Sequence, residues 1–180
     1  MLSKEVLMTT PAGADVEIER KYLLRSLPGR AEGIPGLWIE QGWLPGEVLQ
    51  ERIRRTCVTE NPVGGLHPSW ARFGKYYRTV KLGRGLKRIE IEEECSSDLG
   101  DALWKLTDCQ ISKFRVRIPV DDLVWEVDLF SRLNLILAEV ELPTEDTEVV
   151  LPEWLVPHVV REVTGESRYV NLNLARHGLG

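Results

Sequence analysis

The sequence predicts a mainly β (α+β) fold, an antiparallel eight-stranded barrel with a few short helices packed outside. Apolar and charged residues alternate in short runs along most of the chain. Turn dipeptides such as Pro45-Gly46 separate these runs, and only one segment shows a clear helical period. Short connections favour an antiparallel meander, and about eight strands is a number that can close into a barrel.

Composition sets the broad class. A chain of 180 residues fits one domain, residues 1–180, with a core that needs no disulfides. The net charge of -5 argues against wide contact with nucleic acid or anionic membrane. Cys57, Cys95 and Cys109 lack the close spacing of a zinc motif and are expected to be free thiols. Without an apolar leader or a membrane-length apolar run, we expect a cytoplasmic protein.

Strands are expected first in the N-terminal half of the chain. Residues 15–24 alternate apolar side chains such as Ile18 and Tyr22 with charged ones, which is typical of a half-buried strand. The Pro- and Gly-rich segment 25–36 predicts a loop. The same alternation then predicts strands at 37–44, 47–59, 75–82 and 86–95, with a long loop at 61–74.

The C-terminal half is expected to begin with a helix. Ser96 offers an N-cap, and Leu99, Leu103 and Leu106 follow the helical period, so a short helix should cross one sheet face. Strands are predicted at 110–120, around 125–129, and at 134–142, with a turn at residues 121–122. Residues 159–175 predict a helical or mixed ending.

Charged residues share one face of nearly every predicted strand, because alternate side chains of a strand point the same way. The acidic pairs are Glu17/Glu19, Glu90/Glu92, Glu126/Asp128 and Glu139/Glu141, and the basic residues are Lys21, Arg52, Arg54, Lys81, Arg88, Lys113, Arg115 and Arg117. In a barrel these charges would line the lumen, with the apolar residues facing outward under helices and loops. Burying unpaired charges costs several kcal/mol per ion, so such a lumen must hold water, metal and a charged ligand.

The two sets of charges indicate one kind of ligand. Carboxylates select hard divalent cations, while clustered Arg and Lys select phosphate oxygens. Polyphosphate with Mg²⁺ or Mn²⁺ satisfies both sets. The alternative is a solvated sheet with cross-strand salt bridges. That alternative explains each strand separately but not the four acidic pairs, so we favour the enclosed metal and phosphate site.

The motifs resemble a known family. Residues 17–21, Glu-Ile-Glu-Arg-Lys, are similar to the ExExK signature of the CYTH domain, or triphosphate tunnel metalloenzyme, family. The resemblance continues in chain order through residues 41–44, 52–54, 79–81, 88–92, 113–115, 125–130, 138–142, 152–154 and 163–171. It implies an eight-stranded tunnel that acts on triphosphates with a divalent cation, and it is strongest to the short bacterial members, many of which hydrolyse inorganic tripolyphosphate.

The resemblance implies a metal-dependent triphosphatase, a hydrolase acting on phosphoanhydride bonds. It assigns catalytic roles to Glu17, Glu19, Lys21 and Lys81. It assigns phosphate binding to Lys21, Arg52, Arg54, Lys81, Arg88, Lys113, Arg115 and Arg117. It assigns metal binding to Glu17, Glu19, Asp128, Glu139 and Glu141, and the further acidic residues of the tunnel are Glu90, Glu92 and Glu126.

Three alternatives stay open. The same tunnel could cyclise ATP, as class IV adenylate cyclases do, but the lead-in before Glu17 lacks the His-Phe pair associated with that group. The substrate could instead be a nucleoside or thiamine triphosphate. A non-catalytic polyphosphate-binding module is disfavoured, because acidic pairs repel phosphate when no metal is present. The expected partner is a small-molecule triphosphate, with neither nucleic acid nor membrane, and a homodimer is left open.

Overall fold

The computed structural model describes residues 18–46, 50–59, 73–82 and 89–180. The strands are β1 (Ile18–Leu24), β2 (Gly36–Trp43), β3 (Gln50–Thr59), β4 (Lys75–Leu82), β5 (Ile89–Cys95), β6 (Cys109–Val120), β7 (Leu123–Phe130), β8 (Ile136–Leu142) and β9 (Val159–Glu162). The α-helices are α1 (Ser97–Trp104) and α2 (Asn171–His177), and short 3-10 turns lie at η1 (Gly29–Ala31), η2 (Val156–His158) and η3 (Ser167–Tyr169). The prediction of a mainly β chain with short helices is confirmed.

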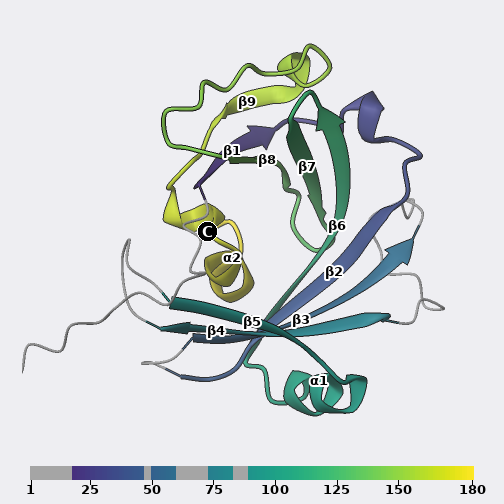
Figure 1. Cartoon of the computed structure of the whole chain (residues 1–180), viewed down its shortest axis with the longest axis vertical. Helices are drawn as coiled ribbons and strands as arrows, with labels where there is room; N and C mark the ends of the chain where they lie inside the picture. The colour runs from purple at the N-terminus through teal and green to yellow at the C-terminus, as the bar shows by residue number, and fades with distance from the viewer. Residues whose placement is uncertain (1–17, 47–49, 60–72, 83–88) are drawn as a thin grey trace, which may run out of the picture.

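The strands form one antiparallel sheet in the order β5-β4-β3-β2-β6-β7-β8-β1-β9. The sheet curls strongly, so that the arm containing β1 and β8 faces the arm containing β4 and β5 (Figure 1). Helix α2 lies between the two arms, and α1 lies on the outside. The curl creates one concave and one convex face.

The connectivity corrects the predicted meander. The hairpins from β2 to β5 and from β6 to β8 form as expected, but β1 pairs with β8 and β9 instead of β2, and β5 does not pair with β6. The linking segments explain the difference, because residues 25–35 and α1 are too long for tight hairpins and carry the chain across the sheet. Hydrogen bonds between described residues leave β5 and β9 as sheet edges, so the predicted closed barrel is not confirmed.

The ninth strand was missed by the sequence analysis, which predicted eight. β9 has only four residues, Val-Val-Arg-Glu, which is too short to show a period of two. It pairs with β1 through Tyr22↔Glu162 and Leu23↔Arg161, and the register shifts after Leu23. The helical or mixed ending predicted for 159–175 is confirmed as mixed, because the segment contains β9, η3 and the start of α2.

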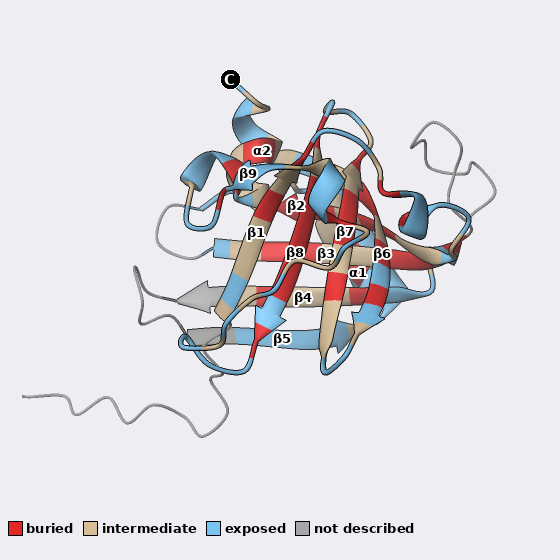
Figure 2. Ribbon diagram, turned by 90° about the horizontal axis from the view of Figure 1, so that it is seen from above, coloured by how far each residue is buried: buried red, intermediate tan, exposed pale blue. Residues whose placement is uncertain are grey.

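The convex face carries the larger apolar core. Trp38, Phe114, Trp125 and Val140 are at most 1% exposed and belong to one cluster that also includes Leu155 of the segment after β8. Figure 2 shows that buried residues concentrate in the central strands, whereas the described part of β5 is exposed. The predicted packing of the apolar alternates under loops is confirmed.

The concave face, called the inner face below, is apolar where α2 packs. Trp43, Ile111, Phe130 and Leu137 form a second cluster with Leu174 of α2. Strand side chains alternate, so Lys113, Asp128 and Glu139 share this face with their neighbours two positions away. The fold therefore places Lys113, Asp128 and Glu139 on the side of the sheet that its two arms enclose, where α2 also lies (Figure 1).

In the part of the chain that the structure describes, no helix has the length and apolar character needed to cross a membrane.

Cys57, Cys95 and Cys109 are free thiols, as predicted. The turn between β6 and β7 is also as predicted, with Asp121 at φ 52°, a left-handed conformation that Asp tolerates better than most residues.

Helix α1 docks on the convex face of β4 through a glycine. Its N-cap is Ser96, whose Oγ accepts from the Leu99 amide at 3.3 Å. A Cβ at Gly100 would lie 2.2 Å from Cδ1 of the buried Tyr76 ring, so only glycine allows this approach. We expect Gly100→Ala to lower the free energy of unfolding by about 1–3 kcal/mol, because overpacking must push the ring or the helix away.

Thermal melts would check this expectation, with Gly29→Ala as the matched control because a Cβ there meets no atom within 4 Å. Gly100→Ala should lower the melting temperature by roughly 2–12 °C, and Gly29→Ala should change it little. Equal melting temperatures for the two variants would contradict the close docking of α1.

Candidate active site

The most deeply buried charges of the inner face centre on Asp128. Its side chain is 0% exposed, and Lys113 beside it is 2% exposed. Lys113 Nζ donates to Asp128 Oδ2 at 2.5 Å, and Arg115 donates from Nε to Oδ1 and from Nη2 to Oδ2, both at 2.6 Å. Burial alone would raise the pKa of Asp128, but Arg115 and Lys113 hold it well below its ordinary value. Both carboxylate oxygens therefore accept from cationic groups.

Arg115 extends the network across three strands. Its Nη2 donates to Glu139 Oε2 on β8 at 2.8 Å, and its Nη1 donates to Glu126 on β7. Glu126 and Glu139 face each other in the register of β7 and β8, so Arg115 bridges two carboxylates that would otherwise repel. A planar guanidinium is suited to this bridging, because its donors point in several fixed directions.

Lys21 of β1 joins the same network from the other side of β8. Its Nζ lies 2.9 Å from Glu139 Oε1 and 3.4 Å from Glu19 Oε1. Although burial opposes it, the carboxylates of Glu139 and Glu19 raise the pKa of Lys21. Lys21 is thus a partly buried cation, with its side chain 12% exposed.

A second charged cluster lies on the opposite arm of the sheet. Arg52 of β3 donates from Nη2 to Thr79 Oγ1 at 2.9 Å and to Glu92 Oε2 at 3.0 Å. The Thr79 hydroxyl donates to the same Glu92 oxygen at 2.7 Å, and Arg54 Nη1 lies 3.8 Å from Glu92 Oε1. Burial would raise the pKa of Glu92, but Arg54, Thr79 and Arg52 lower it. Glu92 is therefore a charged anchor for two arginines.

Arg117 lies nearer the solvent. Its Nε is 3.2 Å from Glu126 Oε1, and its side chain is 60% exposed. Four other predicted residues cannot be placed as fully. Glu17 and Arg88 lie outside the described residues, and for Lys81 and Glu90 the structure describes only their strand positions, where they pair with each other.

One pair of carboxylates on the inner face differs from the others. Glu19 and Glu141 are directly opposite in the register of β1 and β8, which places their side chains on the same face. Among the described residues, no arginine bridges them as Arg115 bridges Glu126 and Glu139, and Glu141 makes no side-chain ion pair or hydrogen bond. Like charges in this position are destabilising unless a cation neutralises them.

The donor set of this pair fits a hard divalent cation. Carboxylate oxygens are the ligands that Mg²⁺ and Mn²⁺ prefer. The described residues contain no group of three or more His, Cys, Asp or Glu side chains placed to hold one ion. Glu17, expected on the same strand face as Glu19, is the carboxylate that would complete the set, and it lies outside the described residues.

Sequence reasoning did not assign roles to three polar side chains that the structure brings to the inner face. Thr79 supports Glu92, Gln41 of β2 is 2% exposed, and Asn171 of α2 lies beside Gln41. A sequence pattern does mark Gln41. Residues 39, 41 and 43 share one strand face, and Gln41 is the polar residue between Ile39 and Trp43. Asn171 ends the segment 163–171 that resembles the family, but the resemblance gave it no role, because its contacts depend on where α2 docks.

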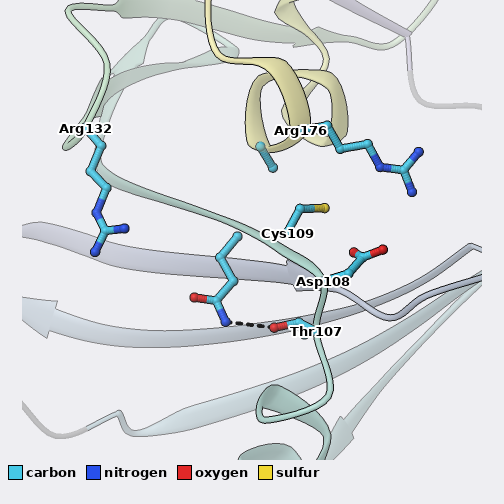
Figure 3. Close-up of a pocket in the computed structure, with 7 residues that line it drawn as sticks. Thr107, Asp108, Cys109, Arg132 and Arg176 are labelled. Carbon is cyan, nitrogen blue, oxygen red and sulfur yellow. Dashed lines mark hydrogen bonds between the residues drawn. The ribbon is translucent and has the colours of Figure 1, made fainter.

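A cavity of about 490 Å³ lies elsewhere, between the start of β6 and the end of α2. Figure 3 shows Arg132 and Arg176 on its two sides, with Asp108 and Cys109 between them. Arg132, Arg176, Asp108 and Gln110 are exposed, and none of the predicted site residues lines the cavity. We place the candidate active site on the inner face, because buried and networked charges are found there.

Comparisons with known proteins agree with the sequence resemblance. No protein-family model matches the chain. The chain is 37% identical over 109 residues to an inorganic triphosphatase from Acetivibrio thermocellus, covering 57% of this chain and 67% of that protein. It is 29% identical over 169 residues to an inorganic triphosphatase from Nitrosomonas europaea, covering 88% of this chain and 96% of that protein.

A solved structure matches over a similar length. The crystal structure of the inorganic triphosphatase NE1496 superposes with a TM-score of 0.60 at 26% identity, covering 91% of this chain and 95% of that chain. The chain therefore belongs to the CYTH family, among the short bacterial inorganic triphosphatases.

Proposed function

We propose that this protein hydrolyses inorganic tripolyphosphate with the help of a divalent cation, on the inner face of the sheet. The observation that carries the proposal is the combination on one face of buried cationic groups and of an opposed pair, Glu19 and Glu141, that no described cation bridges. The cationic groups suit the phosphate oxygens of a triphosphate, and the carboxylate pair suits its metal ion. Curated relatives named inorganic triphosphatase support the same activity.

The basic residues would bind the substrate. Arg52 and Arg54 present guanidinium groups from one arm, and Lys21, Arg115 and Arg117 present cations from the other. We keep Lys113, Lys81 and Arg88 in this set as predictions. Because phosphoryl transfer depends mainly on positioning and charge stabilisation, cations held in place by Glu92 and Asp128 would need little rearrangement when the substrate binds.

The acidic residues divide into two roles. Glu19 and Glu141, with Glu17, would hold the metal, which when bound neutralises phosphate charge and helps to orient water. Asp128, assigned above to the metal, already accepts from Lys113 and Arg115 with both oxygens. We therefore propose Asp128 as an anchor for the cations. Glu139, bonded to Lys21 and Arg115, would connect the anchor to the metal pair.

The remaining features are proposed together. The metal is Mg²⁺ or Mn²⁺, and residues 1–180 form one domain whose two arms enclose the substrate as a tunnel, a proposal supported by the way that the arms face each other around α2 (Figure 1). Three free thiols support a cytoplasmic location. The net charge of -5 supports a small-molecule partner and no nucleic acid or membrane contact.

Phosphate release from tripolyphosphate, ATP and thiamine triphosphate would test the proposal, each with Mg²⁺, with Mn²⁺ and with excess chelator. We expect tripolyphosphate to be the preferred substrate and chelator to abolish turnover, because phosphate charge would then be neutralised by the side chains alone. Cyclic AMP formation from ATP with little tripolyphosphate cleavage would favour a cyclase instead. Tight metal-free binding of tripolyphosphate, with no turnover after metal addition, would favour a binding module.

A further inference from the structure

The side chain of Gln41 occupies a position between the C-terminal helix and the arginines of β3. It lies on the inner face of β2, where its register partners are Arg54 on β3 and Ile111 on β6. It is 2% exposed and ranks among the largest fully buried side chains of the described chain. A buried amide must have its carbonyl and its NH₂ group satisfied, so its neighbours fix its orientation.

The arginines determine which end of the amide faces them. Oxygen and nitrogen of an amide are told apart by their hydrogen-bonding neighbours. With its carbonyl oxygen toward β3, Gln41 accepts from Arg52 Nη1 at 3.3 Å and from Arg54 Nε and Nη2 at 3.2 and 3.3 Å. The opposite orientation would turn an NH₂ donor toward three donors. One neutral acceptor thus joins both guanidinium groups.

Asn171 of α2 lies beside the NH₂ group of the Gln41 side chain. In this orientation the Gln41 amide nitrogen lies 3.2 Å from the side-chain amide of Asn171. The Asn171 carbonyl oxygen is buried and has no hydrogen-bond partner among the described residues. Turning the Asn171 amide in the same way gives that oxygen the Gln41 NH₂ group as donor. In that arrangement hydrogen bonds continue from Asn171 of α2 through Gln41 to the arginines of β3.

The chemistry of the amide suits a phosphate site. A carboxylate at position 41 would hold the same arginines but would cancel positive charge that the substrate needs. A neutral amide orders the guanidinium groups and leaves their charge available. On the other side, Glu92 holds Arg52 at 3.0 Å and Arg54 at 3.8 Å. The two arginines are therefore fixed from opposite sides before any substrate arrives, which lowers the entropy cost of binding.

We infer that Gln41, held by Asn171 of α2, is a positioning residue that sets Arg52 and Arg54 for binding the phosphate oxygens of the substrate. The inference rests on the proposed function and adds a role for the C-terminal helix. Gln41 acts through the arginines, and Asn171 acts through Gln41. The docking of α2 is consequently part of the binding site and not only of the core.

Steady-state kinetics with tripolyphosphate would test the inference. Gln41→Leu should raise KM by about 10- to 100-fold, the effect of losing a hydrogen bond to a charged group, with a much smaller change in kcat. Asn171→Ala should raise KM by about 3- to 10-fold. The matched control is Asn173→Ala on the same helix, which loses a 2.7 Å bond to the Ser167 carbonyl but touches neither arginine. Its KM should stay within about 2-fold of wild type.

A double-mutant cycle separates positioning from support of the fold. If Asn171 acts through Gln41, Asn171→Ala should have no further effect on KM in the Gln41→Leu background. Independent, multiplying effects of the two substitutions would overturn the inference, as would an unchanged KM in Gln41→Leu. Gln41→Glu serves if Gln41→Leu does not fold, since it retains an acceptor for both arginines and should still raise KM through its charge.

A substrate-free measurement keeps this inference distinct from the proposed function. Arginine Nε–Hε exchange, followed by NMR without ligand, should be slow for Arg54 in wild type and in Gln41→Glu, and faster in Gln41→Leu and Asn171→Ala. If wild type neither binds nor hydrolyses tripolyphosphate, the proposed function fails, while the exchange rates still decide the positioning role. Exchange of Arg54 that is the same in wild type, Gln41→Leu and Asn171→Ala would remove the positioning role even if hydrolysis is observed.

Discussion

Glu19→Gln and Glu141→Gln will each lower metal-dependent tripolyphosphate hydrolysis by at least about 100-fold, because several kcal/mol of charge stabilisation depend on the metal. Each substitution keeps the size and hydrogen-bonding capacity of the side chain and removes the charge that the cation requires. The two carboxylates oppose each other on β1 and β8, and no arginine of the described ranges bridges them. Without metal, neither variant should be less stable than wild type, and relief of repulsion should raise its melting temperature by up to about 3 °C.

Activity assays paired with melts in chelator would check this result. Glu145→Gln is the matched control, because Glu145 is an exposed acid shortly after β8 with no described ionic partner. It should keep wild-type activity and stability. Full metal-dependent turnover in both Glu19→Gln and Glu141→Gln would mean that the metal binds elsewhere. A loss of stability in chelator would instead favour a structural salt-bridge role for the pair.

Asp128→Asn will have the largest effect on stability. The substitution keeps the shape of a side chain that is 0% exposed, but it leaves Lys113 and Arg115 without their common counter-charge. Removing one partner of a buried ion pair costs about 3–5 kcal/mol, so we expect the melting temperature to fall by roughly 6–20 °C. The fall should be the same with and without metal if, as proposed, Asp128 holds Lys113 and Arg115 rather than the divalent ion.

The pH dependence of this variant follows from the direction of the pKa shift. The pKa of Asp128 in the folded protein is lowered from its ordinary value of 3.8. Its contribution to stability is therefore fully present above about pH 4 and is lost as the pH falls toward the lower, folded-state pKa. The difference in melting temperature between wild type and Asp128→Asn should be constant from about pH 5 to 7 and narrow below about pH 4.

The exposed turn variant Asp122→Asn is the control for these melts, and its melting temperature should follow that of wild type at every pH. If wild type and Asp128→Asn differed in melting temperature only when metal is added, Asp128 would be a metal ligand. A difference that widens below about pH 4 would contradict the lowered pKa.

Sequence reasoning was most successful where the fold is local. The strands β4 and β6–β8 and helix α1 follow from alternation, turn residues and a serine N-cap, and the shared face of Lys113, Arg115 and Asp128 follows from a period of two. Alternation states which residues share a face, but it does not state which strands become neighbours. Alternation therefore could not predict that β1 pairs with β8 or that Glu19 lies opposite Glu141.

The polar supports of the site were harder to predict for a related reason. Thr79 and Gln41 matter because they bond to groups on adjacent strands, and Asn171 because α2 docks on the inner face. Such contacts depend on tertiary packing between distant segments. β9 was missed because four residues give too little periodicity, although its pairing is fixed once β1 is in place.

The position of β1 between β8 and β9 has a consequence for the order of synthesis and assembly. β1 leaves the ribosome before every other described strand, yet both of its partners lie beyond residue 135. Contacts that span so much of the chain form slowly, since the intervening loop must close first. Nascent chains thus carry Lys21 and Glu19 long before Glu139 and Glu141 can meet them. The proposed metal pair can form only after β8 has emerged, so shorter chains should not hydrolyse cellular triphosphates.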